Sequence, residues 1–273
     1  MSKKPLTRDE QFLAKAAGDD VPMPKPLTRA QEFLERIVER LSGSVTDETL
    51  SNAIAPLNAS IAQLSRKTIQ FRHGKGTFTA TANGTNITWQ YGGQQVQESS
   101  CTFDVKSDNG LITLGCDSIN SFTAEKNTAI KIDLSDLDGK ITNTLSLYSS
   151  PNITGDLSDL GGKITNTLSL GNCSNITGDL SDLGGRISNF LSLSGCTNIT
   201  GVYSGTKYPK TFTVSKTAIT SADMDANLIN FAASSVKSGK FTAIGMKRTA
   251  ASDDAVATLV ANGWTVSGLT KES

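Results

Sequence analysis

The second half of the chain repeats itself every 23 residues. The letters KITNTLSL occupy residues 140–147 and 163–170, and a third copy, RISNFLSL, occupies 186–193. The intervening letters NITGDLSDL stand at 152–160 and 175–183, with a partial copy at 132–137. A period of this length is typical of stacked arrays, in which neighbouring rungs bury a shared apolar column that no single rung has alone. The sequence therefore predicts a solenoid.

Each unit matches the leucine-rich repeat. Leu168-Ser169-Leu170 supplies a strand with inward leucines, and Cys173 stands where that motif takes Asn or Cys. Cys196 repeats this role one unit later, and Ser150 takes it one unit earlier. We therefore predict that both cysteines are buried rung residues and not nucleophiles. The leucines expected to stack above one another are Leu147, Leu170 and Leu193.

Equivalent positions also place carboxylates in columns. One acidic column is Asp133, Asp156 and Asp179, and the other is Asp136, Asp159 and Asp182. Aligned carboxylates are Ca²⁺ ligands in proteins, but no glycine-rich calcium repeat accompanies them. The basic column Lys140, Lys163 and Arg186 follows them along the chain. The sequence thus favours a solvated, partly neutralised face over a calcium site, and no metal or cofactor is predicted.

The outward positions of the repeat strands are small and polar. Solenoids usually bind through an extended face, and several copies on one particle would convert weak contacts into avidity. The candidate binding face consists of Thr144, Ser146, Thr167, Ser169, Phe190 and Ser192.

Composition argues against several function classes. Lys plus Arg and Asp plus Glu both number 26, so no net field draws the chain to nucleic acid or to a membrane surface. No apolar run has the length of a membrane span, and no apolar stretch of a secretory signal follows the basic N-terminus. His73 is the single histidine, which excludes most Ser-His-Asp, Cys-His and His-ligated metal sites. A carboxylate-pair hydrolase stays formally open, but no cleft motif surrounds the Asp columns, so a non-enzymatic protein is predicted.

Two copies of one motif begin the chain. Lys-Pro-Leu-Thr-Arg recurs after 21 residues, and each copy precedes Phe-Leu. Thr7 with Glu10, and Thr28 with Gln31, form capping boxes that start helices. A helix as short as the first is only marginally stable alone in water, so a segment that docks on a larger assembly is favoured over an unanchored terminal tail. The predicted anchoring residues are Leu6, Thr7, Phe12, Leu13, Leu27, Thr28, Phe33 and Leu34.

A heptad-like pattern follows the second copy. Its apolar residues are spaced 4, 3, 4 and 3 apart, as in the a and d positions of a coiled coil. Pro56 interrupts the stretch, so a short trimeric bundle and a helical pair packed on its own domain remain alternatives. The predicted oligomerisation residues are Leu50, Ile54, Leu57, Ile61 and Leu64.

The period changes to two after this stretch. Apolar residues alternate with threonines around Phe78 and Trp89, which predicts a meander of about six short strands with one buried face. Cys101 and Cys116 are expected opposite each other across its last hairpin. Two buried thiols are favoured over a disulfide, because cytosolic synthesis disfavours disulfides.

Beyond the repeat, strands and helices alternate. Strands are predicted at 211–214, 241–244 and 264–266, and helices at about 221–233 and from Ser252 to Asn262. Alternation with divergent rungs is what the cap of a solenoid requires. The predicted organisation is multi-domain: an anchoring peptide (1–24), a helical anchor and oligomerisation segment (25–67), a small all-β domain (68–128), a leucine-rich-repeat-like parallel-β solenoid (129–214) and an α/β C-terminal cap (215–273).

The N-terminal motif resembles the start of accessory virion proteins of tailed bacteriophages. The ending, residues 255–266, is similar to the terminal cap of leucine-rich-repeat proteins from phages and bacteria of the Bacteroides group. This resemblance implies a head or tail fibre, made in the host cytoplasm and present in the virion. It also implies attachment to capsid, tail or portal components through the N-terminus and a homotrimeric state.

Several functions compete within that resemblance. An appendage that binds a host surface protein or glycan is the first, and a capsid decoration or cement protein is the second. A bacterial surface adhesin is disfavoured by the missing signal, and a depolymerase is a weak alternative. Neither nucleic acid nor membrane insertion is expected.

Overall fold

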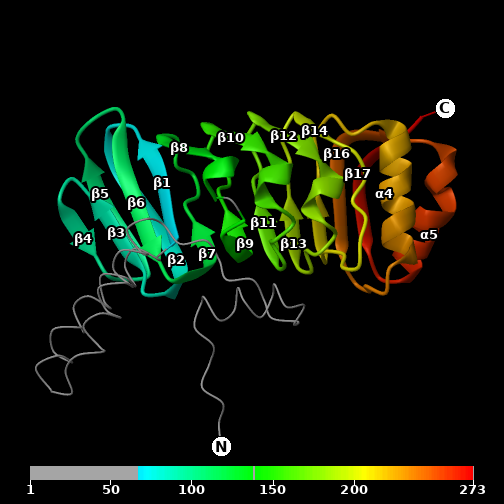
Figure 1. Ribbon diagram of the computed structural model, residues 1–273. Helices are drawn as coiled ribbons and strands as arrows, with labels where there is room; N and C mark the ends of the chain where they lie inside the picture. The colour runs from blue at the N-terminus through cyan, green and yellow to red at the C-terminus, as the bar shows by residue number, and fades with distance from the viewer. Residues whose placement is uncertain (1–66, 138, 273) are drawn as a thin grey trace, which may run out of the picture. The chain divides into compact units, whose positions relative to one another are not determined.

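The computed structural model describes residues 67–137 and 139–272 (Figure 1). This part is mostly β, with parallel strands in its sheets and few helices. The predicted anchoring peptide, the anchoring residues Leu6 to Leu34 and the heptad residues Leu50 to Leu64 lie outside the described residues.

Two sheets run through the described body. In sheet order, the nine-stranded sheet consists of β5 (Ser100–Val105), β2 (Gly76–Thr85), β7 (Ser118–Thr123), β9 (Ile141–Ser146), β11 (Thr167–Ser169), β13 (Phe190–Ser192), β15 (Thr211–Thr213), β16 (Lys240–Arg248) and β17 (Thr265–Lys271). The eight-stranded sheet consists of β4 (Gln94–Val96), β3 (Thr88–Tyr91), β6 (Gly110–Cys116), β1 (Lys67–His73), β8 (Ile130–Asp133), β10 (Ile153–Asp156), β12 (Ile176–Asp179) and β14 (Asn198–Thr200).

The 23-residue rungs stack as the sequence predicts. In β11, Leu168 pairs in parallel with Leu145 on one side and Leu191 on the other. The next leucine of each rung, Leu147, Leu170 and Leu193, is fully buried. After the second strand of each rung a 3₁₀ helix turns the chain, and these helices are η1 (Leu134–Leu137), η2 (Leu157–Leu160) and η3 (Leu180–Leu183).

The small β domain differs from the predicted meander. Its seven strands divide between the two sheets, so the alternating apolar residues of both sheets face one shared interior. Phe78 lies at its centre, 5.4 Å from the ring of Phe71 and 6.2 Å from that of Trp89. The fold here is a sandwich, because every strand needs its apolar face covered and a facing sheet covers it.

The predicted pairing of Cys101 with Cys116 across a hairpin is wrong. β5 pairs with β2, whereas β6 pairs with β1 and β3, so the two cysteines belong to different sheets. The segment between β5 and β6 crosses from one sheet to the other. The preference for thiols is confirmed, since all four cysteines are free and buried.

The sandwich joins the repeat without a break in either sheet. β8 pairs antiparallel with β1, and β9 pairs parallel with β7. At this junction the buried His73 lies with Nε2 3.0 Å from Oδ1 of Asn127. That oxygen also accepts the backbone N–H groups of Ala129 and Ile130, so it acts as an acceptor and Nε2 of His73 is the donor.

The C-terminal elements follow the prediction. α4 (Ser221–Ala233), η4 (Ala250–Ser252) and α5 (Asp253–Ala261) pack beside β15, β16 and β17 at the end of the repeat (Figure 1). The core changes from aliphatic to aromatic at this end: Phe231 contacts the rings of Phe212, Phe241 and Trp264. Thr220 caps α4 by accepting the backbone N–H of Asp223.

Candidate binding surfaces

A row of hydroxyl side chains crosses the outer side of the nine-stranded sheet. Strand register places one serine or threonine from every strand in this row. In sheet order the row is Ser100, Thr81, Thr123, Ser146, Ser169, Ser192, Thr213, Thr242 and Ser267. The predicted candidate face is the middle of this row together with its neighbours.

The predicted serines are less accessible than expected. Ser146, Ser169 and Ser192 point away from the leucine column, yet they are only 5–7% exposed. Neighbouring strands lie about 4.8 Å apart, so the side chains on adjacent strands shield each short serine side chain from solvent. Ser146 also donates a hydrogen bond to the carboxylate of Glu125. The expectation that these serines are open to a ligand is therefore wrong.

The flanking positions of that face are half-buried. Thr144, Thr167 and Phe190 occupy one line across β9, β11 and β13. Thr144 Oγ1 accepts a 3.4 Å contact from the Asn166 amide, within the repeat itself. The structure thus brings the six predicted residues together on adjacent strands, and the side chains of Thr144 and Ser146 bond to Asn166 and Glu125 of the chain itself.

The acidic columns hold the turns of the repeat. Asp156 accepts the backbone N–H of Ser158 at 3.0 Å and the hydroxyl of Thr177, one rung on, at 2.8 Å. Asp159 closes a capping box by accepting the N–H of Asp156 at 2.9 Å. The hydrogen bonds that the Asp156 carboxylate accepts, led by that from the Ser158 backbone, hold the pKa of Asp156 below its usual value. Across residues 67–137 and 139–272, no group of three or more His, Cys, Asp or Glu side chains is arranged to hold a metal ion.

The cysteines of the repeat form a buried column, as predicted. Cys173 and Cys196 donate through Sγ to the carbonyl oxygens of Leu147 and Leu170, at 3.2 and 3.1 Å. Ser150 makes the equivalent contact, 3.2 Å from the carbonyl oxygen of Ala124. Burial raises the pKa of Cys173 to about 11 and that of Cys196 to about 12, which keeps both thiols protonated and unreactive.

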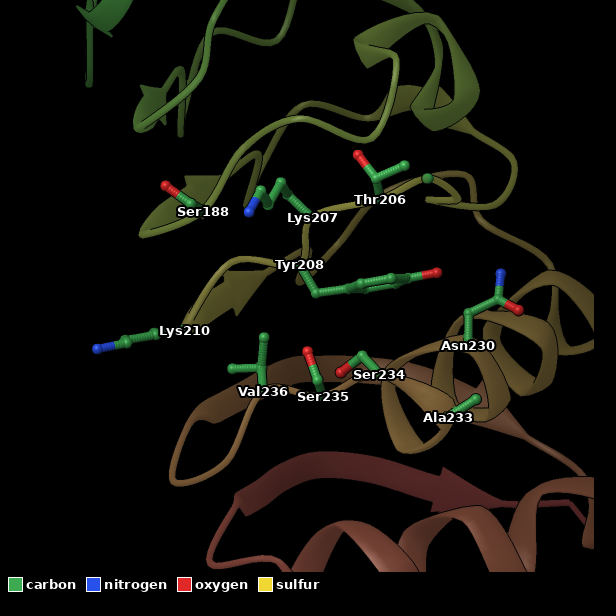
Figure 2. Close-up of a pocket in the computed structure, with 11 residues that line it drawn as sticks. Ser188, Thr206, Lys207, Tyr208, Lys210, Asn230, Ala233, Ser234, Ser235 and Val236 are labelled. Carbon is green, nitrogen blue, oxygen red and sulfur yellow. The ribbon is translucent and has the colours of Figure 1, made fainter.

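The cap carries an open pocket that the sequence did not predict. It encloses about 500 Å³, within the range of roughly 300–1,000 Å³ that small-ligand sites have. It lies between the irregular segment after the last full rung and the C-terminal part of α4 (Figure 2). The residues that line it are Ser188, Gly205, Thr206, Lys207, Tyr208, Lys210, Asn230, Ala233, Ser234, Ser235 and Val236.

One aromatic ring forms the middle of this pocket. Tyr208 is half-buried, with its ring centroid 4.9 Å from that of Phe231 and 5.7 Å from that of Tyr203. Both contacts are edge-to-face, which fixes the ring in place. In Figure 2 Lys207 and Lys210 lie on the side of Tyr208 away from Asn230, and the amine of Lys210 is directed away from the ring.

The fold behind the ring is held by buried polar groups. Asn227, fully buried on α4, accepts the N–H of Tyr203 and donates to the carbonyl oxygens of Gly201 and Asp223. The hydroxyl of Tyr203 in turn bonds the backbone of Ile187. The loss of the 23-residue pattern at 201–210, with two tyrosines and two lysines, is the sequence signal that could have indicated this site.

None of the helices in the described part of the chain is long and apolar enough to cross a membrane. Comparisons of the chain with protein-family models, with curated proteins and with solved structures found no match. What the pocket binds is therefore inferred from the chemistry of its own residues.

Proposed function

We propose that this chain is a bacteriophage virion appendage, a head or tail fibre protein that does no catalysis. In this proposal an N-terminal helical anchor attaches it to capsid, tail or portal components. A leucine-rich-repeat-like solenoid then carries an α/β cap that binds a host-surface glycan. The resemblance of the two Lys-Pro-Leu-Thr-Arg copies to phage accessory proteins supports the proposed attachment to the virion.

The observation that carries the binding half is the position and chemistry of the Tyr208 pocket. The described chain begins in the sandwich at β1, and the rungs of β9, β11 and β13 separate the sandwich from the cap. The cap is thus separated by the rungs of the repeat from β1, the first strand after the predicted anchor. A fixed aromatic ring flanked by hydroxyl, amide and ammonium groups offers an apolar face and hydrogen bonds together, as a sugar ring requires.

Attachment is tested on particles. Virions purified from a culture producing this chain should contain it, by mass spectrometry and by immunogold labelling of intact particles. Its absence from purified virions would refute the appendage proposal, whatever the pocket binds. The homotrimer predicted from the heptad residues is part of the same proposal, and sedimentation equilibrium of the full-length chain should give three times the monomer mass.

Ligand binding is tested on cells. Labelled full-length protein should bind the surface of Bacteroides-group cells, and Tyr208→Ala should weaken binding about threefold to tenfold, the size of an aromatic contact. Tyr148→Ala is the matched control, because Tyr148 is a half-buried tyrosine outside the pocket. Equal binding by the two variants would remove the pocket from the proposal.

A further inference from the structure

The lysine end of the cap pocket carries uncompensated positive charge. Lys207 and Lys210 are exposed, and within the part of the chain that the structure describes neither has a carboxylate partner. Two other lysines of the described cap are paired, since Lys247 lies 3.3 Å from Glu272 and Lys271 lies 2.5 Å from Asp253. Lys216, Lys237 and Lys240 likewise have no carboxylate partner among the described residues. Among the described residues that line the pocket, none is acidic.

Further cations lie beside this end. The backbone N–H of Lys240, the first residue of β16, donates at 2.7 Å to the carbonyl oxygen of Lys210, the residue before β15, so the two residues lie side by side. The N–H of Lys207 donates to Gly185, the residue before Arg186. The basic column of the repeat therefore ends next to the pocket. The chain as a whole has no net charge, so this concentration of positive charge is local.

The opposite end presents neutral polar groups. Asn230 donates its amide to the carbonyl oxygen of Tyr203 at 3.2 Å, and its amide oxygen accepts no hydrogen bond from any described residue. The hydroxyl of Tyr208 likewise has no hydrogen-bond partner among the residues described. The amide oxygen of Asn230 and the hydroxyl of Tyr208 can therefore each form a further hydrogen bond. Next to an aromatic ring, such groups match the hydroxyl groups of a carbohydrate.

We propose that the Tyr208 pocket takes an acidic saccharide, with its carboxylate or sulfate group at the end that Lys207 and Lys210 line and its ring against Tyr208. This proposal rests on the proposed function and narrows its ligand class from glycans in general to anionic ones. The neutral groups at the Asn230 end favour a saccharide over a nucleic acid, whose phosphates would call for cations along the whole path.

The experiment is calorimetric titration of the full-length protein with matched oligosaccharides. Tetragalacturonate and a heparin tetrasaccharide are the acidic probes, and galactotetraose is the neutral one. At least one of the two acidic probes should bind, and the neutral probe should not. Lys207→Gln with Lys210→Gln should weaken the acidic interaction about tenfold, because two exposed ion pairs are removed, and the remaining affinity should depend less on salt.

Two controls separate the pocket from charge in general. Lys75→Gln with Lys131→Gln removes the same charge from exposed positions in the sandwich and in the adjoining strand β8, away from the pocket, and should leave binding unchanged. Tyr208→Ala should weaken binding at unchanged salt dependence, whereas Tyr208→Phe should keep most of it.

The outcomes are distinct from those of the appendage test. Failure of every acidic probe, equal binding of the neutral probe, or an equal loss in the two double variants would each overturn the proposal. An oligothymidylate of equal charge that binds as tightly as the saccharides and ignores Tyr208→Ala would also overturn it, in favour of nonspecific anion binding. Lysine-dependent saccharide binding in a chain absent from virions would uphold this site and refute the appendage.

Discussion

One small side chain in each rung bonds back to the preceding rung. Ser150, Cys173 and Cys196 occupy this position, and they donate to the carbonyl oxygens of Ala124, Leu147 and Leu170. The oxygen of Leu170 also accepts the backbone N–H of Cys173 at 3.0 Å. The oxygen of Leu147 has no other donor among the described residues, so an absent donor there would leave a buried polar group without a partner. Serine and cysteine both fit because they share their size and a donor on the same atom. Local chemistry thus explains why the repeat accepts either residue here.

Replacement of Cys173 should separate the role of its donor from that of its volume. Cys173→Ala leaves the carbonyl oxygen of Leu147 without a partner and should lower the free energy of unfolding by about 1–3 kcal/mol. Cys173→Ser keeps a donor, as at Ser150, and should cost less. Urea denaturation at equal protein concentration measures both. Equal losses in the two variants would show that packing, and not the hydrogen bond, accounts for this position.

Two glycines of the repeat, Gly178 within β12 and Gly161 after η2, are required for different reasons. Gly178 has φ +123°, and a Cβ there would lie 2.8 Å from the backbone nitrogen of Leu157 in the rung before. Gly161 follows η2 at φ +56°, and a Cβ there would meet only the side chain of Lys163, no closer than 3.8 Å. The first glycine is required by close approach between rungs, and the second only by a left-handed backbone.

This difference predicts a contrast between two glycine variants. Gly178→Ala adds steric overlap with the fixed backbone to conformational strain and should destabilise the protein by about 3–5 kcal/mol. Gly161→Ala should cost about 1–2 kcal/mol, the strain of a left-handed residue alone. Thermal unfolding followed by circular dichroism compares them. A loss at Gly161 as large as that at Gly178 would contradict the role of the rung-to-rung contact.

The predictability of each element follows from how local its cause is. The rungs and the elements of the cap were predictable, because identical letters at a fixed spacing and local capping residues define them. The partner strands of β5 and of β6 were not predictable, because alternation identifies which side of a strand is buried but not the sheet to which the strand belongs. The Tyr208 pocket was not predictable either, since it needs the contact between 205–210 and α4, two segments without a shared pattern.

The described body as a whole has an aliphatic middle and two aromatic ends. Leucine and isoleucine columns fill the repeat, whereas Phe78 and Trp89 fill the sandwich and Phe231 and Trp264 fill the cap. A stack of rungs exposes its apolar column at both ends, and solenoids need distinct terminal structures to cover it. The sandwich covers one end by continuing both sheets, and the cap covers the other with α4 and its aromatic cluster.

Acid should weaken this body. The pKa values of Asp133 and Asp156 are lowered mainly by hydrogen bonds within the turns. Burial alone would raise the pKa of Asp225, but hydrogen bonds from Ser252 and Thr249 and the nearby Arg248 outweigh it and lower the pKa. Because the unfolded chain then binds protons first, this stability is present above about pH 4 and is lost as pH falls further.

The pH dependence is measured by urea midpoints between about pH 2 and pH 7. The midpoint should be nearly flat above about pH 5 and should fall steeply below about pH 4. Asp225→Asn should be less stable at neutral pH and should show a shallower fall in acid. A variant with the same acid slope as the parent would show that Asp225 is not among the groups that titrate on unfolding.

The two tryptophans of the chain report separately on the two ends. Trp89 is fully buried in the sandwich and Trp264 is 3% exposed in the cap. The nine-stranded sheet passes without a break from β5 in the sandwich to β17 in the cap, so strand pairing links the two ends and one end should not unfold without the other. The Trp264→Phe variant retains only Trp89, and the Trp89→Phe variant retains only Trp264. In each variant the tryptophan fluorescence should change at the same urea concentration as the far-UV circular dichroism signal. Each variant is compared only with itself, because the substitution alone shifts stability. If Trp264 responded at lower urea than the circular dichroism signal, the cap would be a separate folding unit, and the continuous sheet would not couple the binding pocket to the sandwich.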